Sequence, residues 1–312
     1  ARNYTRLFLI FIAGRVSKKQ TLSSGSRRHS PFYFSDRCVS EQRKIMTQVL
    51  TALPVFNEEK YVQEVLDQVL QYTDHVLVVD DGSTDNTASI LKERVKKHGD
   101  VTVMHHETNR GYGAALATAF AYARHPREDG SCWKGLITID CDGQHQPQLI
   151  PSFIAALEKP ENNPPDIVSG SRYLECLPGN DAAPEGRRRI NMEITHEINQ
   201  RLGLSLTDTF CGFKAYSRKA LESLFVTETG YAMPLEVWVL AAAAKLNIVE
   251  VPVPLVYLDL TRSFGGALDD GTTRIAHYRE ILERAIRSIH ARSGVDRGVG
   301  YGVGSLTTRV DV

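Results

Sequence analysis

Two aspartates, Asp140 and Asp142, follow a short apolar stretch of the chain, and Gln144 comes two residues later. Carboxylates bind hard divalent cations, and Mg²⁺ takes only one or two of them while it keeps positions for water and substrate phosphate. A lone Asp-x-Asp pair is also typical of a solvated turn, because turns favour aspartate for their own hydrogen bonding. We nevertheless predict a site for Mg²⁺ or Mn²⁺ made by Asp140, Asp142 and Gln144.

Two more polar clusters follow predicted strands, at residues 57–59 (Asn-Glu-Glu) and 80–83 (Asp-Asp-Gly-Ser). A tight turn with a helix cap would explain Gly82 and Ser83, but it leaves two adjacent carboxylates without a role. We therefore expect one acid of the second cluster to contact a ligand.

The elements that must position these clusters alternate between strand and helix. Apolar spacing predicts strands at residues 49–55, 75–79, 101–105 and 136–139, separated by helices at 58–72, about 83–97 and 111–124. Such alternation implies βαβ units and parallel strands, and ligands of parallel sheets bind at the carboxyl ends of the strands. The polar clusters fall at those ends. The sequence thus predicts an α/β fold with a Rossmann-like, mostly parallel sheet flanked by helices.

We expect a single catalytic domain at residues 46–262. Its second half has predicted helices at 148–158, 187–202 and 235–245, and an edge strand at 249–256 that contains two prolines. Residues 263–312 would add an amphipathic helix at 278–291 and a flexible tail.

Residues 1–45 differ in composition from the rest of the chain. They carry a net charge of +8, against −8 for the remainder, and have no hydrophobic periodicity. They are expected to be disordered or to lie upstream of a start at Met46, with a signal peptide as the alternative. The apolar run at 7–13 is shorter than the roughly 20 residues of a membrane span.

The acidic body argues against nucleic-acid binding, which needs clustered Lys and Arg. Five cysteines without a CxxC pair favour neither a disulfide framework nor a zinc site and indicate a reducing compartment. We therefore expect a cytoplasmic protein, and its oligomeric state stays open.

Six ordered motifs resemble the family-two glycosyltransferases of the GT-A fold, and among them the dolichol-phosphate mannosyltransferase group. They are LPVFNEE (53–59), VVDDGSTD (78–85), NRGYGAA (109–115), IDCDGQHQP (139–147), GSRY (170–173) and CGFKAY (211–216). The resemblance implies transfer of a mannose- or glucose-type sugar from a GDP- or UDP-sugar, with inversion at the anomeric carbon. The acceptor it implies is a polyprenyl phosphate such as dolichyl or undecaprenyl phosphate.

The resemblance also implies roles for single residues. Those implied to contact the nucleotide or the donor backbone are Pro54, Asn57, Glu58, Asp81, Gly111 and Gly113, while Asp140, Asp142 and Gln144 would hold the metal and the diphosphate. Arg172, together with Arg188 or Arg189, would hold the acceptor phosphate. The chain departs from the usual pattern at Lys214, where relatives have an arginine, and a lysine cannot copy a bidentate guanidinium.

The acceptor decides whether a general base is needed. A phosphate monoester is already an anion at neutral pH, whereas a hydroxyl acceptor, such as one on a cell-surface glycan, would need a base. Asp208 is the first candidate for that base and Glu236 the second. A role as an ion-pair or capping partner is the alternative for Glu236.

The predicted C-terminal helix has Arg279, Arg284 and Arg287 beside an apolar face. This composition suits a helix that lies in a membrane interface and so a peripheral protein that meets a lipid acceptor at the cytoplasmic membrane surface. A helix packed on the domain is the alternative.

Two other functional classes are considered. A nucleotidyltransferase would need a glycine-rich phosphate loop after the first strand, where this chain has Phe56-Asn57-Glu58-Glu59. A catalytically silent nucleotide-sugar-binding module is disfavoured by the intact Asp140, Asp142 and Gln144.

Overall fold

The computed structural model describes residues 48–127, 129–159, 162–177, 180, 184–258 and 266–295. The chain divides into a unit of residues 1–39 and a unit of residues 40–312, and every described element lies in the second. The predictions for residues 1–45 and for the tail after residue 295 fall outside the described residues.

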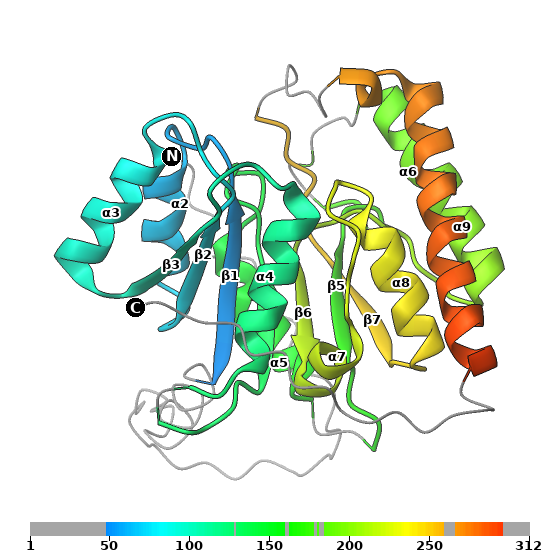
Figure 1. Cartoon of the computed structure of the whole chain (residues 1–312), viewed down its shortest axis with the longest axis horizontal. Coiled ribbons are helices and arrows are strands. Elements are labelled where there is room, and N and C mark those ends of the chain that lie inside the picture. Colours follow the sequence, from blue (N-terminus) through cyan, green and yellow to red (C-terminus); the bar gives the residue numbers. More distant parts are fainter. Residues whose placement is uncertain are drawn as a thin grey trace, which may run out of the picture. The chain divides into compact units, whose positions relative to one another are not determined.

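The described strands form one seven-stranded sheet (Figure 1). They are β1 (Val49–Val55), β2 (Val76–Asp80), β3 (Val101–His105), β4 (Gly135–Thr138), β5 (Ile167–Ser171), β6 (Lys214–Ser217) and β7 (Ile248–Pro252), in the spatial order β3-β2-β1-β4-β6-β5-β7. Neighbours pair in parallel, except that β6 is antiparallel to both β4 and β5. The predicted α/β fold with a mostly parallel sheet is therefore confirmed, and β7 lies at an edge.

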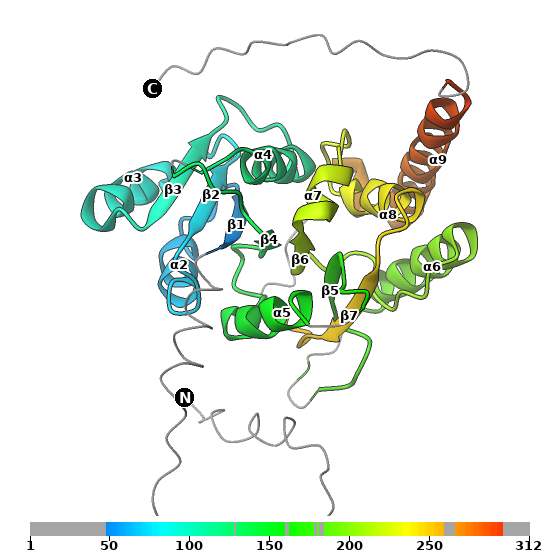
Figure 2. The same ribbon diagram turned by 90° about the horizontal axis from the view of Figure 1, so that it is seen from below.

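Helices cover both faces of this sheet (Figure 2). One hydrophobic cluster joins it to α4 (Tyr112–Arg124), α6 (Glu185–Leu202), α7 (Arg218–Ser223), α8 (Met233–Ala243) and α9 (Gly271–Val295). The other joins it to α2 (Val62–Val69), α3 (Thr87–His98) and α5 (Ile150–Leu157). Because both faces are covered, β2 and β4 are buried along their whole length and their sequences are continuously apolar up to the final residues.

The C-terminal helix α9 belongs to this core. It packs on α6 and α8, and the residues of its apolar face are buried: Tyr278, Ile281, Leu282 and Ala285. Arg279 pairs with Glu193 at 2.9 Å, and Arg284 pairs with Glu228. The apolar face of α9 is thus used for packing. This agrees with the alternative of a helix packed on the domain, rather than with a helix that lies in a membrane interface. No helix in the described ranges combines the length and the apolar character that a membrane span requires.

Candidate active site

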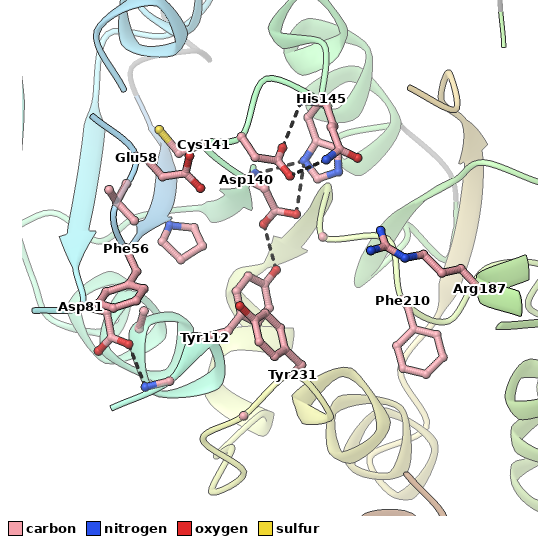
Figure 3. A pocket seen from close by; sticks show the side chains of 18 of the residues that line it. Phe56, Glu58, Asp81, Tyr112, Asp140, Cys141, His145, Arg187, Phe210 and Tyr231 are labelled. Atoms are coloured by element: carbon pink, nitrogen blue, oxygen red, sulfur yellow. Dashed lines mark hydrogen bonds and ion pairs between the residues drawn. The ribbon is translucent and has the colours of Figure 1, made fainter. Parts of the chain in front are cut away.

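A cavity of about 700 Å³ lies at the carboxyl ends of the parallel strands (Figure 3). Residues that follow β1, β2, β4 and β5 line it, and so does the segment before β6, because β6 runs in the opposite direction and enters the sheet from this edge. Helices α4, α6 and α9 supply further walls. The lining residues used below are Pro54, Phe56, Glu58, Asp81, Gly111, Tyr112, Asp140, Asp142, Gln144, His145, Arg172, Arg187, Ile190, Asn191, Phe210, Gly212, Tyr231, Arg274 and Tyr278.

Asp140 lines the cavity between Asp81 on one side and Arg187 on the other (Figure 3). Its Oδ1 accepts a hydrogen bond from the Tyr112 hydroxyl at 3.0 Å, and its backbone N–H donates to His145 Nδ1 at 3.0 Å. A Cβ added to Gly212 would overlap the Asp140 carboxylate. The motif Cys-Gly-Phe therefore needs its glycine so that this carboxylate can fit against the chain before β6.

Asp142 is oriented by Gln144. The backbone N–H of Gln144 donates to Asp142 Oδ1 at 3.0 Å, and its side-chain amide donates to Oδ2 at 3.0 Å. Among the described residues no three His, Cys, Asp or Glu side chains are grouped so that they could hold a metal on their own. The carboxylates of Asp140 and Asp142 both line the cavity, and two carboxylates fit a cation such as Mg²⁺ that completes its ligands with water and phosphate oxygens.

Asp81 holds the loop that precedes α4 in place through hydrogen bonds. Its carboxylate accepts the backbone N–H groups of Arg110 at 3.0 Å and Gly111 at 2.7 Å, and it contacts His106 Nδ1 at 2.6 Å. The residue is only 3 % exposed, although it lines the cavity. Contact between Asp81 and a nucleotide base stays a prediction, as do the donor contacts of Pro54 and Glu58, which line the same end.

Asn57 lies outside the residues that line the cavity. Its backbone has a positive φ of 55°, and its side-chain oxygen accepts the N–H groups of Thr84 at 2.8 Å and Asp85 at 3.3 Å. It joins the loop after β1 to the loop after β2. In this structure Asn57 therefore shapes the site rather than facing the ligand space.

Gly111 and Gly113 are needed for packing within the chain. A Cβ on Gly111, whose φ is +102°, would overlap the backbone of Thr229, and one on Gly113 would overlap that of Glu228. Gly111 also lines the cavity, whereas Gly113 does not. Their close approach to a donor stays a prediction.

Arg172, which lines the cavity, forms an ion pair with the buried Asp208. Arg172 Nε and Nη2 donate to the two Asp208 oxygens at 2.6 and 2.9 Å, and Asn191 and the backbone of Phe210 donate to the same carboxylate. Burial disfavours the ionised form, but the charge of Arg172 and these donors hold the pKa of Asp208 at about 2.

The expectation that Asp208 acts as a general base finds no support in this geometry. The residue is 0 % exposed, its oxygens are occupied by donors, and a carboxylate with so low a pKa is a weak base. Its evident role is to position Arg172. The carboxylate oxygens of Glu236 are likewise occupied, because they accept hydrogen bonds from Thr227 Oγ1 at 2.7 Å and from the backbone N–H of Glu228 at 2.6 Å.

The arginine run at the start of α6 has one member at the cavity, and it is Arg187 rather than Arg188 or Arg189. Arg187 lines the cavity with Ile190 and Asn191, which follow at helical spacing on the same face. Arg188 and Arg189 are exposed and are absent from the lining. This geometry gives no support to the predicted acceptor contacts of Arg188 or Arg189, and Arg187 is the member of the run that lines the cavity.

Lys214 is 2 % exposed and lies behind the cavity wall. Its ammonium group donates to the Cys211 carbonyl and sits over the Trp238 ring, 5.3 Å from the centroid. Burial lowers its pKa. Lys214 therefore supports the backbone next to Asp140 and does not reach the ligand space.

Charge is divided between the two ends of the cavity. The carboxylates in its lining come from the segments after β1, β2 and β4, and we call this the acidic end: Glu58, Asp81, Asp140 and Asp142. The arginines come from the segment after β5, from α6 and from α9, and we call this the arginine end: Arg172, Arg187 and Arg274. Figure 3 shows Asp81 and Phe56 on one side of Asp140, and Arg187 and Phe210 on the other.

Comparison with known proteins points to one family. Residues 51–225 match the family model described as glycosyl transferase family 2. The undecaprenyl-phosphate mannosyltransferase of Micrococcus luteus is 28 % identical over 240 residues, which are 74 % of this chain and 93 % of that protein. A UDP-N-acetylglucosamine–dolichyl-phosphate N-acetylglucosaminyltransferase of Methanococcus voltae is 29 % identical over 238 residues, 68 % of this chain and 87 % of that protein.

The fold is similar to that of a solved structure, the glucosyl-3-phosphoglycerate synthase of Mycobacterium tuberculosis. The TM-score is 0.57 at 18 % identity, and the match covers 84 % of this chain and 85 % of that one. This likeness supports the GT-A fold.

Proposed function

The chain belongs to glycosyl transferase family 2, and on that premise we propose that it transfers one sugar from a nucleotide-sugar donor to a polyprenyl phosphate. The sugar is of the mannose or glucose type, and the donor is a GDP- or UDP-sugar. The relatives in Micrococcus luteus and Methanococcus voltae are named for acceptors of this lipid-phosphate class.

The division of charge in the cavity is the observation that carries the proposal. The acidic end suits a diphosphate that arrives with a divalent cation, because two like-charged groups need a metal between them. The arginine end suits an anionic acceptor, since guanidinium groups form charge-assisted hydrogen bonds with phosphate oxygens. A hydroxyl acceptor would give the arginines no comparable partner.

The donor set at Asp140 and Asp142 fits Mg²⁺ or Mn²⁺. These two carboxylates would hold the ion together with the side-chain oxygen of Gln144. The amide nitrogen of Gln144 orients Asp142, and the Tyr112 hydroxyl orients Asp140. When bound, such an ion neutralises charge that develops on a leaving diphosphate.

The protein's own residues would align the acceptor. Arg172 and Arg187 hold the phosphate at the arginine end, so that one of its oxygens faces the anomeric carbon of a sugar bound beside Asp140. Attack from this side, opposite the leaving group, inverts the anomeric carbon. Because the phosphate is already ionised near neutral pH, no side chain has to remove a proton. This agrees with the structure, in which hydrogen bonds already occupy the carboxylates of Asp208 and Glu236.

The acceptor's hydrocarbon chain places the reaction at a membrane surface. We propose that the protein meets it there as a peripheral protein on the cytoplasmic face. Because α9 uses its apolar face for packing, this part of the proposal rests on the acceptor class and not on that helix.

The deciding assay offers the full chain a short-chain polyprenyl phosphate and the matching polyprenol, each with labelled GDP- and UDP-sugars and with Mg²⁺ or Mn²⁺. We expect transfer to the phosphate only, and loss of transfer when a chelator removes the cation. Transfer to the alcohol but not to the phosphate would refute the proposed acceptor. Donor binding without transfer to either acceptor would favour a catalytically silent nucleotide-sugar-binding module.

Tyr112→Phe tests how Asp140 is oriented. The change removes only the hydroxyl that donates to Asp140 Oδ1, and loss of a partner of a metal ligand typically weakens metal affinity about 10- to 100-fold. We expect a shift of that size in the Mn²⁺ concentration that half-saturates donor binding, measured by calorimetry. Tyr122→Phe, on the same helix but outside the cavity, is the matched control. An unchanged Mn²⁺ dependence in Tyr112→Phe would show that the hydroxyl does not orient the site.

A further inference from the structure

Helix α9 brings an arginine to the cavity from outside the family-matched residues 51–225. Arg274 lies in the first turns of α9, lines the cavity and is 7 % exposed. Tyr278 follows four residues later on the same face, also lines the cavity, and packs on Phe210 with 4.8 Å between ring centroids. This face of α9 forms a wall of the arginine end.

The position of Arg274 is fixed relative to α6, the helix that carries Arg187. A Cβ on Gly271, at the start of α9, would be in contact with the Ile190 side chain at 3.4 Å, and Ile190 is one turn after Arg187. Further along, Arg279 pairs with Glu193 of α6 at 2.9 Å. The two helices therefore present Arg187 and Arg274 to the same cavity as one packed unit.

A phosphate acceptor gives the arginines at this end of the cavity a task. A phosphate monoester carries about −1.5 to −2 charges at pH 7. Three arginines among the described lining residues supply guanidinium groups here: Arg172, which also pairs with Asp208, Arg187 and Arg274. Guanidinium groups form charge-assisted hydrogen bonds with phosphate oxygens.

We infer that Arg274 is an acceptor-binding residue, which together with Arg187 holds the phosphate of the acceptor, so that α9 completes the active site. This inference rests on the proposed function. It names a specific residue beyond the arginines that the sequence motifs indicated, and it makes the C-terminal helix part of the catalytic unit.

The test uses three variants of the full chain. Arg274→Gln removes the charge, Arg274→Lys keeps the charge but loses the planar fork, and Arg287→Gln changes an exposed arginine of the same helix outside the cavity lining. KM for a short-chain polyprenyl phosphate and Kd for the donor are measured for each. A preserved donor Kd and melting temperature establish that a variant is folded.

We expect Arg274→Gln to raise the acceptor KM about 10- to 100-fold, as for loss of a hydrogen bond between charged groups, with donor Kd unchanged. Arg274→Lys should fall between Arg274→Gln and the unchanged chain, and Arg287→Gln should behave as the unchanged chain. An acceptor KM that does not change in Arg274→Gln, or a loss confined to donor affinity, would overturn the inference while leaving the proposed function in place.

Calorimetric titration with the short-chain polyprenyl phosphate alone distinguishes a failure of the proposed function from a failure of the inference about Arg274. If the unchanged chain binds this phosphate but does not transfer sugar to it, the proposed function fails, and weaker binding by Arg274→Gln still supports the inference. Equal binding by both, or binding by neither, overturns it.

Discussion

Replacing Asp140 by asparagine is expected to lower the rate of sugar transfer by about 100- to 1000-fold, the usual cost of removing one preorganised electrostatic group from an active site. The side chain faces the cavity and is 28 % exposed, so its negative charge is available to a cation. Asparagine has almost the same shape, and its oxygen can still accept the hydrogen bond from Tyr112. The melting temperature should therefore stay within about 2 °C of the original, as for changes that disturb no packing.

Initial rates at saturating donor, together with thermal unfolding, measure both parts of this expectation. Asp74→Asn serves as the control, because Asp74 is exposed and precedes β2, at the opposite end of the sheet from the cavity. Asp140→Asn should also lose the dependence of donor binding on Mn²⁺. A variant that keeps both its rate and its Mn²⁺ dependence would remove Asp140 from the proposed metal site.

The sheet and its ligand edge could be predicted because their signals are local. Apolar runs of strand length, separated by amphipathic helices, predicted β1 to β4, and the polar clusters after three of them predicted the edge that holds the cavity. The short strand β6 was not predicted, since Lys214–Ser217 is too brief for an alternating pattern. Its reversed direction brings Gly212 against Asp140, a contact that depends on pairing with β4 and β5.

The acceptor side was predicted less well because it depends on the rotation of a helix. Three consecutive arginines start α6, and each points about 100° from the next around the helix axis. Which one faces the cavity is decided by the buried stripe of Ile190, Ile194 and Ile198. Arg187 lies one turn before that stripe, a periodicity that was present in the sequence and could have selected it.

Arg274 and Tyr231 could not be found in the same way. Neither belongs to a recognised motif, and both reach the cavity only because α8 and α9 fold back over the sheet. Asp208 shows the opposite case, since its place beside a motif made it a candidate base, a role that its hydrogen bonds do not support. The hydrogen bonds that occupy its oxygens come from residues far apart in sequence.

Asp208→Asn is expected to cost both stability and activity. One carboxylate oxygen becomes an NH₂ group, which cannot accept the hydrogen bond from Arg172, and Arg172 keeps a charge with no partner ion. Breaking a buried ion pair by removing one partner costs about 3–5 kcal/mol. Because the Arg172 side chain is 24 % exposed, we expect the lower value. This corresponds to a fall in melting temperature of about 6–12 °C for a domain of this size.

The pH dependence follows from the low pKa of Asp208, about 2 in the folded chain. A carboxylate whose folded pKa lies below its unfolded value of roughly 3.9 stabilises the fold fully above that value. This contribution is lost as pH falls from about 4 towards 2. The melting temperatures of the original chain and Asp208→Asn should therefore differ by a constant amount between about pH 5 and pH 8 and converge in acid.

The double variant Arg172→Met with Asp208→Asn separates stability from function. It removes the uncompensated cation while the asparagine oxygen still accepts from Asn191 and from the backbone N–H of Phe210. We expect it to regain at least half of the stability that Asp208→Asn loses, a coupling that a double-mutant cycle with Arg172→Met measures directly. The rate of sugar transfer to a polyprenyl phosphate should stay at least about 100-fold below that of the original chain, because a hydrogen-bonding cation is lost from the arginine end. If activity returned together with stability, Arg172 would be a structural residue and the acceptor phosphate would have to be held by Arg187 and Arg274.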